Sequence, residues 1–255
     1  MTPLTNKDRM PNHVAIIPDG NRRWARSRGL PILEGHRRGF EAVNAVIRVA
    51  RDLGIHTMTF WAFSTENWNR SKGEVSYLMK LYAQYLDDHL QEALDNDTRI
   101  VHLGRKSRLP KVLRKKIEEA ETRSATNKTH VLNIGLDYGG QDEILRAVQK
   151  IAEDIGQNKI TAKDLYKEVG KYNGKYPYYF FKNYLDTGDQ AYPYPDLVIR
   201  TSGEQRLSGF LSWQSAYSEF YFADVHMPDF KEEEFKKALV DFTSRERRFG
   251  GDEKK

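Results

Sequence analysis

Short apolar runs recur along the chain, and polar turns follow several of them. Most of these runs lack a clean alternation of apolar and polar positions, which is typical of strands that are buried on both faces of a sheet. Their length also suits strands better than helices. The pattern predicts six strands, at His13–Ile17, Thr57–Phe63, Arg99–Leu103, His130–Gly135, Leu197–Arg200 and Glu219–Ala223.

Helical periodicity fills the intervals between these runs. Alternating strands and helices predict an α/β domain with a mostly parallel sheet, in which ligands bind beyond the carboxyl ends of the strands. Thr161 and Asp164 are spaced as a capping pair that opens a short helix. The predicted apolar helix faces are Phe40, Val43, Ile47 and Ala50; Val75, Leu78, Tyr82, Tyr85, His89, Leu90 and Ala93; Ile144, Leu145, Val148, Ile151 and Ile155; and Phe235, Leu239 and Phe242.

Composition narrows the classes of protein and of chemistry. A chain of 255 residues can bury a substantial core, and no stretch approaches the roughly 20 apolar residues of a membrane span. The first eleven residues lack the apolar segment of a signal peptide, so we expect a soluble cytoplasmic protein. The absence of cysteine excludes disulfides, thiolate zinc sites and cysteine nucleophiles. A net charge of +5 suits nucleic acid, anionic lipid or phosphorylated small molecules.

The first polar turn follows the first predicted strand and opens a predicted helix. Helix N-termini offer free N–H groups and a positive dipole end, which suit a phosphate. Asp19 could hold magnesium, Gly20 allows close backbone approach, and Arg22 and Arg23 could neutralise phosphate charge. A plain Asp-Gly turn capped by Asn21 is an equally weighted alternative, although it does not explain the two arginines.

Two further polar turns follow other predicted strands. The chain from Phe63 to Glu74 carries hydroxyl, carboxylate, amide and guanidinium groups that could line a pocket, although a solvated loop is favoured for such a segment alone. Arg200, Arg206 and Ser208 would grip a diphosphate, since guanidinium forks match phosphate oxygens. The alternative there is a surface turn with weak Arg–Glu pairs. A parallel sheet would bring all three turns to one edge, which favours transfer chemistry with diphosphate as the leaving group.

Six segments resemble, in order, the signatures of the cis-prenyltransferases, the family of undecaprenyl diphosphate synthase. They are HVAIIPDGNRRWAR, GHRRG, FWAFSTENWNR, LNIGLDYGG, DLVIRTSGEQRLSGFLSWQ and RERRFGG. The resemblance implies a single catalytic domain over residues 12–251, with a flexible tail at 1–11 and a second tail at 252–255. It also implies a homodimer with a six-stranded, mainly parallel sheet surrounded by helices. A hydrophobic tunnel would run between the helices at about residues 37–52 and 74–94.

The resemblance supplies roles for individual residues. Asp19 matches the family's essential magnesium-binding aspartate, Glu219 matches a second metal-linked acid, and Asn67 lies at the position of the proposed proton acceptor. Because an amide is a poor base, we expect Asn67 to position groups while a diphosphate oxygen takes the proton. The implied substrate-binding residues are Gly20, Asn21, Arg22, Arg23, Trp24, His36, Ser64, Thr65, Glu66, Trp68, Arg70, Glu74, Arg200, Arg206, Leu207, Ser208, Arg248 and Gly250.

The implied activity is magnesium-dependent condensation of isopentenyl diphosphate with an allylic diphosphate, farnesyl or geranylgeranyl diphosphate. The expected product is a long, undecaprenyl-like cis-polyprenyl diphosphate that serves as a lipid carrier, and its synthesis would involve transient contact with a membrane surface. A short- or medium-chain synthase is the nearest alternative. A non-catalytic partner subunit ranks low because Asp19, Arg200, Arg206 and Glu219 are all present. An RNA-binding module has no supporting motif, so no nucleic-acid partner is expected.

The aromatic segment Lys171–Pro195 is too irregular for a strand or helix prediction. Long structured loops are often functional, whereas a packed surface loop is the more frequent outcome. His130 on the fourth strand, and the small Ala62 on the second, bear on product length: a small residue at position 62 favours a long or medium chain.

Overall fold

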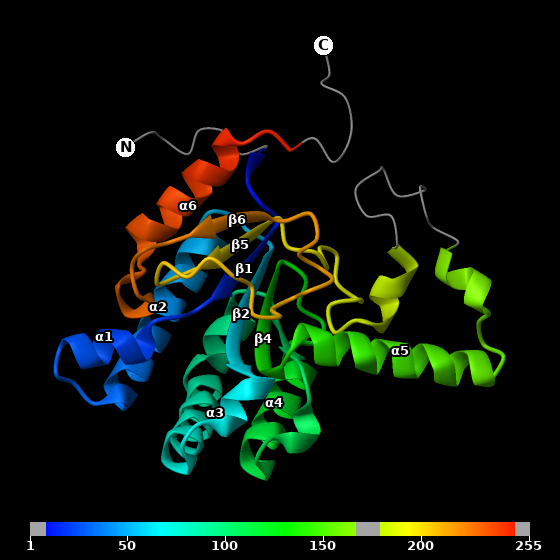
Figure 1. Ribbon diagram of the computed structural model, residues 1–255, viewed down its shortest axis with the longest axis horizontal. Coiled ribbons are helices and arrows are strands. Elements are labelled where there is room, and N and C mark those ends of the chain that lie inside the picture. Colours follow the sequence, from blue (N-terminus) through cyan, green and yellow to red (C-terminus); the bar gives the residue numbers. More distant parts are fainter. Residues whose placement is uncertain (1–8, 167–178, 248–255) are drawn as a thin grey trace.

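Six parallel strands form the centre of the molecule (Figure 1). The computed structural model describes residues 9–166 and 179–247. The order across the sheet is β3-β4-β2-β1-β5-β6, and each neighbouring pair is parallel. The strands are β1 His13–Ile17, β2 Thr57–Ser64, β3 Thr98–Leu103, β4 His130–Tyr138, β5 Leu197–Arg200 and β6 Glu219–Phe222.

All six predicted strands are confirmed, and the differences lie at their ends. β4 extends three residues beyond Gly135, because Leu136 and Tyr138 continue the pairing with β2 through an irregular stretch. Every residue of β1 and β5 is buried, as expected for central strands that are covered on both faces. The carboxyl ends of β1, β2 and β5 share one edge of the sheet, which brings the three polar turns together.

Helices connect the first five strands in sequence and cover the sheet, whereas turns connect β5 to β6. Helix α4 was not predicted, because only Leu113, Ile117 and Ala120, with Ser124, are buried along its charged sequence. Ser71 caps the long helix α3 by accepting a hydrogen bond from the Glu74 N–H. The helices are α1 Asn21–Ser27, α2 Ile32–Asp52, α3 Lys72–Asp95, α4 Lys111–Ser124, α5 Gly140–Gly156 and α6 Glu232–Ser244.

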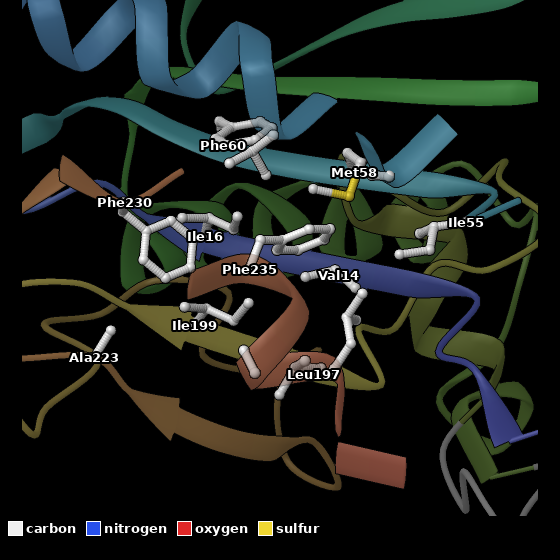
Figure 2. Packing of buried hydrophobic residues seen from close by; sticks show 14 of the residues in the cluster. Val14, Ile16, Ile55, Met58, Phe60, Leu197, Ile199, Ala223, Phe230 and Phe235 are labelled. Atoms are coloured by element: carbon white, nitrogen blue, oxygen red, sulfur yellow. The ribbon is translucent and has the colours of Figure 1, made fainter. Parts of the chain in front are cut away.

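The main apolar core lies between one sheet face and the helices α2 and α6. Figure 2 shows Phe235 of α6 beside Val14 and Ile16 of β1, with Leu197 and Ile199 of β5 nearby. These side chains alternate with residues such as Ala15 and Val198, which pack on the other face with Phe210 and Leu211. The alternation of buried residues on two faces explains why the strands read as continuous apolar runs.

Helix α5 departs from its predicted packing. It extends away from the sheet on the side opposite α1 (Figure 1), and Leu145, Val148 and Ile155 are exposed by 69%, 51% and 36%. Of its predicted apolar face, Ile151 is buried. The apolar periodicity therefore predicted the helix correctly, but much of that face is uncovered in the single chain.

The connection before β5 is packed against the sheet where it is described. Gln190 exchanges hydrogen bonds with Asn133 of β4, and the Tyr192 carbonyl contacts the His13 ring. The predicted capping pair is also present, since Asp164 accepts hydrogen bonds from the N–H and hydroxyl of Thr161 beside the short 3-10 helix Ala162–Tyr166. Part of the predicted loop, residues 171–178, lies outside the described residues.

Candidate active site

A cavity of about 580 Å³ opens at the carboxyl edge of the sheet and continues between the sheet and the helices. Its mouth is polar, and its deeper part is an apolar chamber bounded by β2, β3, β4, α2, α3 and α4. Twelve of the predicted site residues line it: Asp19, Gly20, Asn21, Arg22, Arg23, His36, Ser64, Glu66, Asn67, Arg70, Arg200 and Ser208. The convergence predicted for the three polar turns is therefore confirmed.

The turn after β1 carries Asp19 into the mouth. Its backbone is fixed by Thr201, whose hydroxyl accepts from the Asp19 N–H at 2.8 Å and donates to the Asp19 carbonyl at 2.7 Å. Gly20 then adopts a left-handed conformation, with φ of 95°, and precedes α1. A side chain there would be both strained and obstructed. The turn thus places the Asp19 carboxylate directly before a helix N-terminus.

Arg200, at the end of β5, holds both the Asp19 carboxylate and the following loop. Its Nη2 donates to Asp19 Oδ2 at 2.8 Å, while Nη1 donates to the Arg206 carbonyl and, at 3.0 Å, to Ser208 Oγ. Burial opposes ionisation of Asp19, but the hydrogen bond and charge of Arg200, with the charge of Arg23, lower the pKa of Asp19 below its ordinary value. Asp19 is therefore an ionised carboxylate at neutral pH.

Two glycines of α2 allow α1 to seat closely against it. A Cβ atom at Gly35 would lie 2.1 Å from the Asn21 carbonyl oxygen, and one at Gly39 would lie 2.3 Å from Asn21 Oδ1. Only glycine permits this approach. The glycines of the GHRRG segment thereby position the start of α1, and with it Arg22 and Arg23, at the cavity mouth.

The opposite wall of the mouth is the 3-10 turn Thr65–Asn69 and the start of α3. Asn67 Oδ1 accepts from the Ser64 N–H at 3.2 Å, so that the Asn67 side chain is held against its own turn. Glu74 is buried and receives hydrogen bonds from Arg70 at 3.1 Å and His36 at 3.0 Å. Burial lowers the pKa of His36 despite the nearby Glu74 carboxylate.

Several buried polar atoms of the mouth make no hydrogen bond within the described parts of the chain, although Arg22 Nε lies 4.0 Å from the Glu74 carboxylate. They include Arg22 Nε and Arg200 Nε, both on side chains that line the cavity. Buried donors are paired in nearly all proteins, so unpaired guanidinium donors in a cavity wall indicate a site for an anionic ligand. Arg26, one helical turn beyond Arg22, also lines the cavity and was not predicted.

Aromatic rings from α2 and α3 narrow the apolar chamber. The ring centroid of Phe40 lies 5.2 Å from that of Tyr82 and 5.5 Å from that of Tyr85. Tyr82 is anchored by donating its hydroxyl hydrogen to the Ala62 carbonyl at 2.5 Å. The helical periodicity placed these rings on apolar faces, but their mutual contact depends on the crossing of two helices that sequence reasoning does not fix.

Several predicted site residues lie behind the mouth instead of in it. Trp24 is buried and stacks with Arg28, and Trp68 donates to Asp137 at 2.7 Å while packing on Phe63. Glu219 lies at the amino end of β6, where it pairs with Arg245. It is therefore remote from Asp19, which follows the carboxyl end of β1. Thr65, Glu74, Arg206 and Leu207 also do not line the cavity, and Arg248 and Gly250 lie outside the described residues.

The fold and site define a prenyltransferase of the cis type, and comparison with known proteins agrees. The family model described as "Putative undecaprenyl diphosphate synthase" matches residues 17–250. An isoprenyl transferase of Clostridium perfringens is 42% identical over 245 residues, covering 96% of this chain and 92% of that protein. The corresponding protein of Streptococcus agalactiae is 42% identical, covering 95% and 94%. The chain therefore belongs to the undecaprenyl diphosphate synthase family of prenyltransferases.

Two solved structures share the fold. Lavandulyl diphosphate synthase from Lavandula x intermedia, in complex with dimethylallyl diphosphate, has a TM-score of 0.88 and 39% identity, covering 95% of this chain and 99% of that one. A probable undecaprenyl diphosphate synthase from Campylobacter jejuni has a TM-score of 0.72 and 29% identity, covering 94% and 98%. The single-domain fold with a six-stranded parallel sheet is thus confirmed.

Proposed function

We propose that the protein condenses isopentenyl diphosphate with an allylic diphosphate, farnesyl or geranylgeranyl diphosphate, to give a long, undecaprenyl-like cis-polyprenyl diphosphate. The observation that carries this proposal is a single cavity with a cationic mouth and an apolar chamber. A prenyl diphosphate has the same division into an anionic head and an apolar tail. The lavandulyl diphosphate synthase structure, which holds dimethylallyl diphosphate, supports the same class of ligand.

Two sets of donors at the mouth suit two diphosphate groups. One is the start of α1, where Arg22 and Arg23 stand beside the free N–H groups of the helix. The other is Arg200 with Ser208 at the end of β5. Placing both groups here would align the allylic carbon with the isopentenyl double bond and stabilise the charge that develops on the leaving diphosphate.

Magnesium fits the donor set that the mouth offers. Among the described residues no group of three or more carboxylates and histidines could hold a metal ion, so Asp19 would be the protein's main ligand there. Magnesium is commonly held by one or two carboxylates with substrate phosphates completing its shell, which matches an ionised Asp19 beside two diphosphates. When bound, magnesium would neutralise phosphate charge. Glu219 of the same chain lies elsewhere, so any metal role for it requires a partner subunit.

Asn67 is suited to orienting groups at the mouth. Its amide oxygen is occupied by the Ser64 N–H, which leaves the amide NH₂ group as a donor. A donor cannot accept the proton that the condensed product loses, so a diphosphate oxygen would take it. Unchanged turnover of an Asn67→Ala variant, or a pH profile set by another residue, would contradict this role.

We further propose a homodimer, cytoplasmic location and transient membrane-surface contact. The exposed apolar side chains of α5, Leu145, Val148 and Ile155, form a surface suited to a second copy. No helix among the described residues is long and apolar enough to span a bilayer. An insoluble polyprenyl product would nevertheless be released toward a membrane.

A short- or medium-chain product is the second candidate, favoured by the contact of the bulky Phe40 ring with Tyr82 and Tyr85 in the lining of the chamber. In contrast, small Ala62 lines the chamber and His130 does not, which favours a longer chain. The test is an assay of purified protein with labelled isopentenyl diphosphate, farnesyl diphosphate and magnesium, with products separated by length. A defined long product supports the first candidate and a single addition supports the second. No incorporation with any allylic primer would refute both.

A variant of the same assay tests whether the rings limit chain growth. Replacing Tyr85 with alanine removes the ring that contacts Phe40 from α3. We expect the Tyr85→Ala enzyme to make a longer product than the parent enzyme, with little change in the rate of the first addition. Tyr77→Ala on the same helix is a control because Tyr77 does not line the cavity. An unchanged product length would place the limit elsewhere in the chamber.

A further inference from the structure

A serine and a histidine form a hydrogen bond directly behind the Asp19-Gly20 turn. Ser202 Oγ and His226 Nδ1 lie 2.5 Å apart. Ser202 belongs to the turn after β5, and His226 to the segment between β6 and the 3-10 helix Met227–Asp229. Neither residue lines the cavity, so the pair lies outside the substrate site described above.

The pair packs against the Cα atom of Gly20. A Cβ atom at Gly20 would lie 2.4 Å from Ser202 Oγ and 2.6 Å from His226 Nδ1. These short distances show that the pair closely covers one side of Gly20. Gly20 therefore has little room to shift toward Ser202 and His226 while the hydrogen bond is in place.

Ser202 adopts a backbone conformation that glycine would accept more readily. Its φ is 83°, in the left-handed region that side chains disfavour, and the residue is 7% exposed. Strained residues persist where the surrounding structure over-determines them, and they concentrate at functional sites. A serine in this position retains the strain and contributes a hydroxyl, and the bond of that hydroxyl is to His226.

The backbone around the pair joins three loops at the same turn. The Ser202 N–H donates to the Val225 carbonyl at 2.8 Å, and the Met227 N–H donates to the Asp19 carbonyl at 3.0 Å. The Thr201 hydroxyl bonds Asp19 from the third side. The turn that carries the Asp19 carboxylate is therefore held by the Met227 N–H and the Thr201 hydroxyl, and it is supported from behind by the Ser202–His226 bond.

We propose that Ser202 and His226 are positioning residues that fix the Asp19-Gly20 turn for diphosphate binding. This inference rests on the proposed function for its catalytic consequence. The pair acts through Gly20: it keeps the start of α1 and the Asp19 carboxylate in register with Arg200. Loss of the hydrogen bond frees Gly20 to shift, and a misplacement of about 1 Å at a reacting centre costs up to about a hundredfold in rate.

The first test uses Ser202→Gly, which removes the hydroxyl and relieves the backbone strain. If the hydroxyl contributes only to stability, the variant should be less stable and as active as the parent enzyme. Positioning predicts a melting temperature equal to or above that of the parent enzyme, with kcat lowered about tenfold. It also predicts about tenfold faster amide hydrogen exchange in the peptide that contains Asp19 and Gly20. Asn158→Gly is the matched control, because Asn158 also has a positive φ but lies two residues beyond the end of α5 and does not line the cavity.

The second test uses the histidine. His226→Leu should reproduce the kinetic and exchange effects of Ser202→Gly, and the double variant should be no worse than either single variant, since all three lose one shared bond. His226→Asn, which keeps a polar atom near the Nδ1 position, should restore part of kcat. Independent, multiplicative losses, or exchange and kcat equal to those of the Asn158→Gly control, would overturn the proposal. Hydrogen exchange measures the effect of the pair on the Asp19-Gly20 turn even if the parent enzyme does not condense the diphosphates. A failure of this proposal can therefore be distinguished from a failure of the proposed function.

Discussion

Two clusters of polar side chains differ in how fully their buried atoms are hydrogen-bonded. The mouth cluster consists of Asp19, Arg22 and Arg200 at the carboxyl edge. The interior network consists of His13, Thr59, Asn133 and Gln190 on the face opposite the chamber. The mouth cluster leaves the Nε donors of Arg22 and Arg200 without a hydrogen bond within the described chain, whereas the side-chain polar atoms of the interior network are all hydrogen-bonded.

The hydrogen bonds of the interior network form a continuous chain. His13 Nδ1 faces the Tyr192 carbonyl at 2.8 Å and must donate to it, so the neutral ring accepts from Thr59 through Nε2 at 2.7 Å. Thr59 in turn accepts from Asn133, which exchanges hydrogen bonds with Gln190. Complete pairing of this kind fixes the positions of β1, β2 and β4 relative to one another and to the loop that precedes β5.

This difference distinguishes polar side chains that bind a ligand from polar side chains that stabilise the fold. Unpaired buried donors cost stability, and they are retained where a ligand will satisfy them. We therefore expect substitutions in the mouth cluster to reduce activity while leaving stability nearly unchanged. Substitutions in the interior network should do the reverse.

The largest expected effect is that of Asp19→Asn. The change keeps the shape of the side chain but removes the charge that Arg200 and a magnesium ion would share. We expect kcat to fall by at least about a hundredfold, as for the loss of other preorganised electrostatic groups. The melting temperature should change little. Steady-state assays and thermal unfolding check both parts, with Asp52→Asn on the exposed end of α2 as the control. An active Asp19→Asn enzyme would remove the mouth cluster from the mechanism.

Arg200→Lys should have a smaller effect on the same comparison. Lysine keeps the charge but cannot reach Asp19, the Arg206 carbonyl and Ser208 together, as the guanidinium does. We expect KM for isopentenyl diphosphate to rise about tenfold or more, with a smaller fall in kcat. Initial-rate kinetics with each substrate varied in turn make the measurement. A rise confined to KM for the allylic substrate would exchange the roles assigned to the two sets of donors.

The fold could be predicted from the sequence largely because central parallel strands carry continuous apolar runs. The six strands could be predicted from such runs. Their order in the sheet could not, because it depends on pairings between residues far apart in sequence, such as Val14 with Leu197. Helix α4 escaped prediction because its stripe of Leu113, Ile117 and Ala120 is narrow within a charged segment. The exposure of α5 also could not be predicted, because periodicity identifies a face without showing what covers it.

The candidate site was predictable as a set of turns but not as a geometry. The polar turns at strand ends, together with the family resemblance, led to Asp19, Arg200 and Asn67. Which side chains of each turn enter the cavity depends on local backbone direction: Asn67 lines it, and Trp68 turns to Asp137. Thr201, although it lies next to Arg200, carried no signal in the sequence, because its role depends on a bond across two strands.

The interior network provides the converse prediction for stability. Asn133→Ala leaves the Gln190 amide and the Thr59 hydroxyl without their buried partner. We expect the free energy of unfolding to fall by about 2 kcal/mol, with kcat per folded molecule unchanged. Urea unfolding gives the first quantity and assays well below the transition give the second. Gln149→Ala, which removes an exposed amide from α5, should change neither. A loss of kcat without a loss of stability would contradict the separate roles assigned to the two clusters.

The smallest expected effect concerns the pH dependence of stability. Burial lowers the pKa of His13 to about 4, despite the nearby Asp196 carboxylate. Between about pH 6.5 and pH 4 the unfolded chain binds a proton at His13 that the folded chain does not, so His13 makes the protein less stable as pH falls through this range. Below that range both states are protonated and the loss stops growing.

A His13→Gln variant isolates this contribution, because other groups titrate equally in both proteins. Its free energy of unfolding should be lower than that of the parent protein at pH 7, since Gln cannot reproduce both ring hydrogen bonds. The difference should shrink as pH falls toward 4, by up to about 3 kcal/mol, which corresponds to a shift of some two to three pKa units. Urea unfolding at several pH values makes the measurement. Parallel curves would mean that His13 binds its proton at the same pH in the folded and unfolded states. Below about pH 6.5, Nε2 of the folded protein would then donate a hydrogen bond to Thr59 instead of accepting one from it.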